Sequence, residues 1–275
     1  MLSGSQLGDE EYVRILDKLN RTTAMNETKA ATGTMHPHTG MTTRHDAWWL
    51  APLMVATGFT LFIVYATYRA FENNFYEIGA IISPFYSPKI VLDWFPFSPA
   101  LLILWMPAGF RATCYYYRKA YYRAYFLTPP ACGVKVYGNK GYTGERAFPF
   151  VLQNLHRYFF YLAVLVLTIL WYDAFKALIE PKFHLDLVTV IMFINCFLLS
   201  GYTFGCHAYR HLAGGGLNCF SENESTKQRF KIWEFVTKLN EHHMGWAWCS
   251  LFSVGFTDFY IRQVCANVFP NPTFF

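Results

Sequence analysis

The stretch "AWWLAPLMVATGFTLFIVYATY", residues 47–68, contains no charged side chain. A helix of about 20 apolar residues crosses the roughly 30 Å hydrocarbon core of a bilayer. Helices on the surface of a soluble domain are amphipathic instead, with an apolar stripe on one face. We therefore interpret residues 47–68 as a transmembrane helix and prefer this interpretation to a large soluble helical core.

Four further apolar runs follow the first one. They are "FPFSPALLILWMPAGF" (95–110), "YFFYLAVLVLTILWY" (158–172), "LVTVIMFINCFLLSGYTFG" (187–205) and "MGWAWCSLFSVGFTDFYI" (244–261). Only 15% of the residues are charged, against about 25% in soluble domains. We predict an all-α integral membrane protein with five transmembrane helices in a bundle over residues 47–265. A polar tail (1–46), with a short helix at 8–20, and a short outer tail (266–275) flank it.

Two details of the runs carry expectations of their own. Pro96, Pro99 and Pro107 are expected to bend the second run, because proline interrupts helical hydrogen bonding. Asp258 is the one acid in the fifth run. We expect it to make a helix–helix hydrogen bond, with proton exchange as the alternative.

Basic residues are concentrated on one side of the predicted topology. The loop between the second and third runs contains a single acid, Glu145, and these basic residues: Arg111, Arg118, Lys119, Arg123, Lys135, Lys140 and Arg146. An excess of Lys and Arg marks the cytoplasmic face. The N-terminus is therefore predicted to be cytoplasmic, in a multi-pass protein of the cell inner (plasma) membrane. The net charge of +5 follows from this topology, and no nucleic-acid motif accompanies it.

Cysteine and histidine side chains gather at the cytoplasmic ends of the predicted helices. They are Cys114, Cys132, His156, Cys206, His207, His211, His242 and His243. Ionisable residues at membrane depth are rare without a role, so this convergence predicts an electron-transfer centre. His207 and His211 share one helix face and could hold one metal ion. The remaining helix cysteines, Cys196, Cys249 and Cys265, are interpreted as packing residues, and the reducing compartment argues against a disulfide framework.

The donor types narrow the chemistry. Two Cys with two His suit a Rieske-type [2Fe–2S] centre, and no CxxC pair for structural zinc is present. One alternative is a haem b anchor with His156, His207, His211 or His243 as axial ligands. A second alternative is a transporter or structural anchor without redox function, although no internal repeat of the kind common in transporters is found.

Longer motifs resemble a known family. The segments "RATCYYYRKAYYRAYFLTPPAC", "LQNLHRYFFY", "CHAYRH" and "LNEHHMGWAWCSLFSVGFTDFY" are similar to the membrane-anchor subunit (SdhC) of mycobacterial-type succinate dehydrogenase 1, also called type F complex II. The similarity covers residues 45–265. Mycobacterial members carry "CHSCRH" where this chain has "CHAYRH", and Tyr209 cannot replace a thiolate ligand.

This resemblance implies partners, cofactors and a reaction. A flavoprotein subunit oxidises succinate and an iron–sulfur subunit relays the electrons. The anchor passes them through an embedded Rieske-type [2Fe–2S] cluster to a quinone, expected to be menaquinone, in the respiratory chain and the tricarboxylic acid cycle. The first-choice ligands are Cys114, Cys206, His156 and His243. Cys132, His207 and His211 are held in reserve.

A quinone site needs an apolar slot with polar groups at the quinone carbonyls. The residues that flank the proposed cluster and could supply these groups are Arg157, Tyr158, Tyr209, Arg210 and Trp246. Tyr116, Tyr117 and Arg118 are the alternatives. For most residues of this tyrosine-rich run we favour an interfacial aromatic belt.

Overall fold

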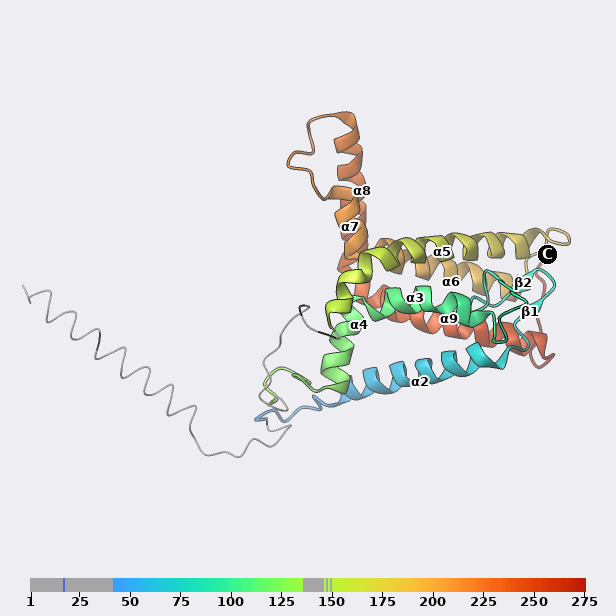
Figure 1. Ribbon diagram of the computed structural model, residues 1–275, viewed down its shortest axis with the longest axis horizontal. Coiled ribbons are helices and arrows are strands. Elements are labelled where there is room, and N and C mark those ends of the chain that lie inside the picture. Colours follow the sequence, from blue (N-terminus) through green and yellow to red (C-terminus); the bar gives the residue numbers. More distant parts are fainter. Residues whose placement is uncertain (1–16, 18–41, 136–145, 147, 149) are drawn as a thin grey trace, which may run out of the picture.

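The computed structural model describes residue 17, residues 42–135, 146 and 148, and residues 150–275. The predicted short helix at 8–20 and most of the polar tail therefore lie outside the described residues. Helices dominate the described chain. Those that run side by side in one bundle (Figure 1) are α2 (Leu50–Glu72), α3 (Ala100–Ala112), α5 (His156–Ile179), α6 (Leu187–Phe204) and α9 (His243–Cys265).

Each predicted apolar run corresponds to one of these helices, with ends that differ by a few residues. Within the described ranges, three helices are long and apolar enough to cross a membrane: Leu50–Glu72, Val151–Ile179 and Leu187–Phe204. The helix α9 has 23 residues and packs along α6, but Asp258 and Arg262 interrupt its apolar character. The integral membrane character is thus supported, and the total of five spans stays a prediction.

The second run differs from the prediction. Only α3, with 13 residues, is helical, because Pro96 and Pro99 disfavour a helical backbone at the residues that precede them. Pro107 lies inside α3. The irregular segment 73–99 includes a small antiparallel pair, β1 (Glu77–Ile78) and β2 (Ile81–Ile82). The fold is mostly helical, which is consistent with the predicted all-α membrane protein.

Residues of this irregular segment are buried against α2 and α3 at one end of the bundle. Phe85 and Tyr86 belong to a buried cluster with Ala70 and Ala100. The Tyr86 hydroxyl donates a 2.8 Å hydrogen bond to the Arg69 carbonyl, which lies in the last turn of α2. A buried non-helical backbone requires internal hydrogen-bond partners, and this packing supplies one of them.

The same end of the bundle contains a buried charged network. Asp258 accepts hydrogen bonds from the hydroxyls of Tyr65, at 2.7 Å, and Ser83. Arg262 pairs with Asp258 at 2.9 Å and with Glu72 at 3.1 Å. The bond from Tyr65 of α2 to Asp258 of α9 confirms the expected helix–helix hydrogen bond. The network ties these two helices together.

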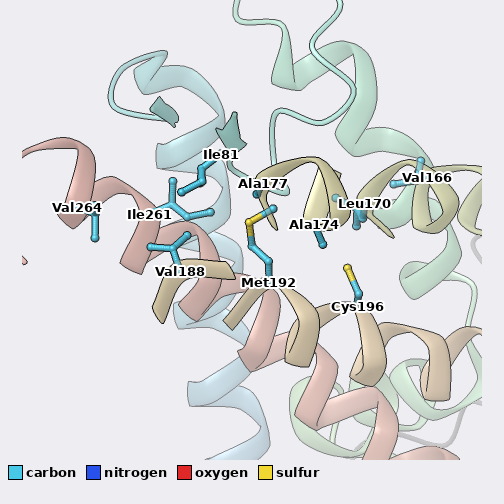
Figure 2. Close-up of a cluster of buried hydrophobic side chains, with 10 residues drawn as sticks. All are labelled: Ile81, Val166, Leu170, Ala174, Ala177, Val188, Met192, Cys196, Ile261 and Val264. Carbon is cyan, nitrogen blue, oxygen red and sulfur yellow. The ribbon is translucent and has the colours of Figure 1, made fainter. Parts of the chain in front are cut away.

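Apolar side chains fill the interior between α5, α6 and α9 next to this network. Figure 2 shows the cluster, which includes Ala174, Ala177, Val188, Met192 and Cys196. The predicted packing role of Cys196 agrees with its burial, since it lies inside this cluster. Cys249 is exposed and Cys265 is half-buried.

Short helices lie crosswise at the opposite end of the bundle (Figure 1), which we call the site end. They are α4 (Tyr115–Ala120), the π-helical turn η1 (Tyr121–Tyr125), α7 (His207–Gly214) and α8 (Glu224–Glu241). The helices α7 and α8 pack against each other as a hairpin that projects away from the bundle. The 3₁₀ turn η3 (Phe150–Leu155) leads into α5.

Candidate metal centre

Two cysteines and two histidines lie at helix boundaries of the site end. Cys114 is the extended residue between α3 and α4, and Cys206 is the extended residue between α6 and α7. His156 is the first residue of α5 and His243 the first of α9. Both cysteines are 1% exposed and His243 is 2% exposed. Four different chain segments thus deliver the four donors to one buried region.

These four residues, which we call the quartet, form two contacts. The His156 Nε2 atom lies 3.0 Å from the Cys206 Sγ atom. The Cys114 Sγ atom lies 3.8 Å from the His243 Nε2 atom. Cys114 and Cys206 belong to one cluster of buried side chains, so the two contacts are neighbours in the interior.

Aromatic rings connect the two contacts. Phe110 stacks on the His156 ring at 4.7 Å between centroids, and Tyr202 stacks on the His243 ring at 5.0 Å. Phe110 and Tyr202 meet at 5.2 Å. The continuous ring contact from His156 to His243 holds both imidazoles in a defined orientation and excludes water.

The four side chains of the quartet have the donor types of a two-iron centre. Among the described residues, no group of three or more Cys, His, Asp or Glu side chains is close enough to hold a single metal ion. A [2Fe–2S] cluster instead takes two protein ligands at each iron, and Rieske-type centres use two Cys and two His. The quartet has this composition.

The surroundings of His156 define which ring nitrogen is free to bind a metal. The Thr113 hydroxyl donates a 2.7 Å hydrogen bond to the Gly109 carbonyl. Its oxygen therefore accepts from the His156 Nδ1 atom, which lies 2.9 Å away. With the proton on Nδ1, the Nε2 atom presents its lone pair toward Cys206. Metal-binding histidines are oriented by a partner on the second nitrogen in this way.

His243 has one nitrogen without a partner. Its Nδ1 atom is buried and makes no hydrogen bond within the described part of the chain. Buried polar atoms almost always have a partner, so this nitrogen is a candidate for a bond to an absent group. Gly205 borders it, since a Cβ atom there would lie 3.3 Å from the Nδ1 atom and 2.6 Å from the Gly201 carbonyl.

Arg111 brings a positive charge to the centre. Its guanidinium donates to the Tyr117 hydroxyl at 2.7 Å, to the Ala247 carbonyl at 3.1 Å and to the Ser250 hydroxyl at 3.0 Å. It also lies over the Tyr202 ring, 4.6 Å from the centroid. A cation at this place stabilises thiolate ligands. The sequence counted Arg111 only as a loop residue that indicates topology.

An apolar cavity of about 430 Å³ opens beside Arg111 and Tyr202. Its other walls come from the bundle helices, with Phe62, Leu104 and Val254 among them. The Tyr202 hydroxyl is buried and lies beside the Cys114 thiol. The cavity combines apolar walls with a few polar groups, as sites for hydrophobic ligands do.

Two of the reserve ligands, Cys132 and His211, are exposed. The third, His207, directly follows Cys206 and interacts electrostatically with His156 and His243. The Cys132 carbonyl accepts a 2.7 Å hydrogen bond from Arg44. His207 and His211 contact each other on the surface of α7, with 3.1 Å between their Nε2 atoms. Partial burial lowers the pKa of His207, and the nearby His211 and Arg210 lower it further.

The residues predicted to bind a quinone are distributed over several surfaces. Arg157 and Tyr158 are exposed. Tyr209 stacks on Phe160 at 5.6 Å, and Arg210 donates to the Thr237 hydroxyl at 3.0 Å within the hairpin. Trp246 packs against α6, and its indole nitrogen is buried without a partner in the described chain. Their role in quinone binding stays a prediction.

Comparisons with known proteins agree with the resemblance in the sequence. A family model described as actinobacterial succinate dehydrogenase subunit SdhC matches residues 50–267. A solved structure, the Mycobacterium smegmatis Sdh1 complex in the apo form, contains a chain 40% identical to this one. The match covers 89% of this chain and 97% of that chain, with a TM-score of 0.78. A comparison with curated proteins gives no significant match.

Proposed function

Because this chain belongs to the actinobacterial family of succinate dehydrogenase subunit SdhC, we propose that it anchors a succinate:quinone oxidoreductase in the plasma membrane and reduces the quinone there. The match to a chain of the Sdh1 complex supports assembly with a flavoprotein subunit and an iron–sulfur subunit. Succinate oxidation then takes place in the flavoprotein. This chain receives the electrons on its cytoplasmic side and crosses the membrane five times.

The quartet of Cys114, Cys206, His156 and His243 is the observation that supports this proposal. These residues would hold a Rieske-type [2Fe–2S] cluster, which supplies one-electron transfer at a potential suited to quinones. The two thiols bind as thiolates, Thr113 keeps the His156 proton on Nδ1, and Arg111 offsets the thiolate charge. The packed rings of Phe110 and Tyr202 exclude water from the centre.

The cavity beside Arg111 supports a place for the quinone ring. The Tyr202 hydroxyl, which lies beside the Cys114 thiol, and the Arg111 guanidinium offer hydrogen-bond donors for a quinone carbonyl, and the apolar walls accommodate the ring. The Tyr202 ring contacts both His243 and Arg111. A quinone in this cavity would be separated from the proposed ligands by only the Tyr202 side chain. This short path favours fast electron transfer, so we prefer the cavity to the exposed surface at Tyr158 as the quinone site.

EPR of the dithionite-reduced complex, paired with an optical spectrum, tests the cluster. We expect a Rieske-type signal with a low average g value and no haem absorption bands. Rieske-type centres group thiolates on one iron and imidazoles on the other, a grouping that histidine nitrogen couplings in pulsed EPR would report. Haem bands without the EPR signal would support the haem b alternative. The absence of both would mean that the chain anchors the complex without a redox centre of its own.

Single substitutions separate the quartet from the reserve ligands. Cys114→Ser, Cys206→Ser, His156→Ala and His243→Ala are expected to abolish the signal and quinone reduction together. The matched controls Cys132→Ser, His207→Ala and His211→Ala are expected to keep both. Loss of the signal in a control variant, with retention in a quartet variant, would reassign the ligands.

Two tyrosine variants distinguish the proposed quinone places. Tyr202→Phe removes the buried hydroxyl beside the cavity, and Tyr158→Phe removes an exposed one. We expect Tyr202→Phe to raise the KM for a soluble quinone by roughly tenfold, since one hydrogen bond is worth about 1 kcal/mol or more. Tyr158→Phe is expected to behave as the parent protein, and the reverse result would favour the exposed group.

A further inference from the structure

The outer face of α8 carries apolar side chains that no part of the described chain covers. Ile232 is 44% exposed and Phe235 is 61% exposed. Leu239, which is half-buried and lies close to Gly205, continues the same side of the helix at a spacing of four residues from Phe235. An exposed apolar stripe of this kind marks a surface for a partner or a lipid bilayer.

Charged residues are ordered around this stripe. Lys231 and Lys238 lie next to Phe235 at spacings of four and three residues, on the exposed surface. Glu234 and Glu241 lie beyond the lysines, farther from the stripe. Over residues 231–241 the exposed surface of α8 therefore changes from apolar to cationic to acidic, while the polar residues Gln228 and Glu224 continue the face of the stripe toward the start of the helix. This order matches the layers of acyl chains, anionic headgroups and water at a membrane surface.

The position of α8 in the fold keeps it at the membrane surface. It ends at Glu241, and α9 begins at His243, so one residue separates the two helices. The hairpin extends crosswise to the bundle helices from the site end (Figure 1), and the bundle helices are those that we propose cross the membrane. A helix that leaves the bundle in this direction stays at the depth of its attached end. The whole of α8 thus lies near the headgroups.

The hairpin is a preformed unit. Asn223 and Thr226 make a capping box at the start of α8. Arg229 donates a 2.9 Å hydrogen bond to the Ala213 carbonyl at the end of α7. Trp233 stacks with Phe230 at 5.9 Å. These contacts fix which face of α8 points outward, so the stripe does not result from an unfolded or frayed segment.

From this geometry we infer that the α7–α8 hairpin is an interfacial anchor that binds the cytoplasmic leaflet beside the bundle. Ile232 and Phe235 enter the acyl-chain boundary. Lys231 and Lys238 extend from it to anionic headgroups, as long basic side chains do at interfaces. This role is independent of the cluster and of the quinone.

Photocrosslinking in the whole complex tests the inference. Benzoylphenylalanine replaces Phe235, and in a matched control it replaces Glu234, the neighbouring exposed residue on the acidic side. The complex is reconstituted in phosphatidylcholine vesicles, with or without phosphatidylglycerol, and irradiated. We expect a lipid adduct of this subunit, identified by mass spectrometry, at position 235 and not at position 234.

The other outcomes contradict the inference. A crosslink from position 235 to the iron–sulfur subunit would make the stripe a protein interface. The absence of any crosslink at position 235 would mean that the stripe faces water, which contradicts the inference. For the lysines, we expect phosphatidylglycerol to increase the adduct severalfold and the double variant Lys231→Gln, Lys238→Gln to remove that increase. An adduct that does not respond to phosphatidylglycerol would overturn the headgroup contact.

Discussion

At the scale of single residues, the Thr113 hydroxyl determines the chemistry available to His156. It is the acceptor that holds the proton on Nδ1 and leaves Nε2 free. We predict that Thr113→Val lowers the affinity of the site for its metal about 10- to 100-fold, the usual effect of losing a hydrogen-bond partner of a ligand. The occupancy of the cluster falls as a result. Iron content and the integrated EPR signal of the purified complex measure it.

Thr113→Ser is the matched control, because it keeps a hydroxyl at the same place. It is expected to retain the iron content and the signal. If Thr113→Val also retains both, with an unchanged midpoint potential and pH profile, the hydroxyl has no role in orienting His156.

The sequence analysis predicted the four quartet residues as ligands, which stays a prediction, and it missed the residues that contact them. Cys114, His156, Cys206 and His243 are ligand-type residues at helix ends on one predicted side, a pattern visible without a structure. The residue types of Thr113 and Tyr202 suggest no metal chemistry, and their contacts depend on how the helices rotate in the bundle. Cys132 was a plausible substitute by type, but its "PPAC" turn lies at the surface.

At the scale of helices, α6 and α9 approach each other closely at Gly201. A Cβ atom on Gly201 would lie 2.5 Å from the Trp246 ring, so the two helices must separate or the indole must move. We predict that Gly201→Ala destabilises the protein by about 1–3 kcal/mol, the usual cost of overpacking. Thermal unfolding of the detergent-solubilised complex measures this loss.

Gly245→Ala on α9 is the corresponding control. No atom lies within 4 Å of a Cβ built there, and alanine favours a helix over glycine by about 1 kcal/mol. We expect it to be neutral or slightly stabilising. Equal destabilisation by both variants would mean that helix contact at Gly201 is not the cause.

The sequence predicted where the bundle helices lie along the chain better than it predicted where they end. It did not predict the helices that lie crosswise at the site end. The runs at 158–172 and 187–205 gave α5 and α6 because an apolar run has to be helical in a bilayer. The second run was predicted too long, since Pro99 delays the start of α3 to Ala100. The sequence analysis assigned no helix to the segment that forms α8, because its residues carry many charges and no long apolar run.

At the scale of the whole molecule, Arg262 joins α9 to α2 at the end opposite the quartet. It is 2% exposed, and its partner Asp258 is 0% exposed. We predict that Arg262→Leu destabilises the protein by about 3–5 kcal/mol, because it leaves a buried carboxylate without its cation. The unfolding temperature of the complex reports the change.

The exposed pair of Arg44 and Asp46 provides the comparison for Arg262. Its side chains are 34% and 55% exposed, and exposed ion pairs contribute about 1 kcal/mol or less. Arg44→Leu should therefore change the unfolding temperature little. The double variant Arg262→Leu, Asp258→Leu should recover part of the lost stability, and no recovery would argue against charge burial as the cause.

The predicted orientation can be tested with Cys219. This cysteine is exposed in the loop between α7 and α8, and the hydrogen bond from the Ser221 side chain lowers its thiol pKa. We predict that a membrane-impermeant maleimide labels it in inside-out vesicles and not in right-side-out vesicles. Cys219→Ser identifies the signal by removing one label per chain. Labelling from the outer side would reverse the topology.

All four quartet residues lie at one end of the bundle, on the side where the proposed iron–sulfur partner docks. An electron that reaches them from that side would cross little of the membrane's electric field. Moving one charge across the full membrane changes its energy by about 2.3 kcal/mol per 100 mV, and this location avoids most of that difference. Succinate-driven quinone reduction would then proceed at nearly the same rate whether the cell is energised or depolarised.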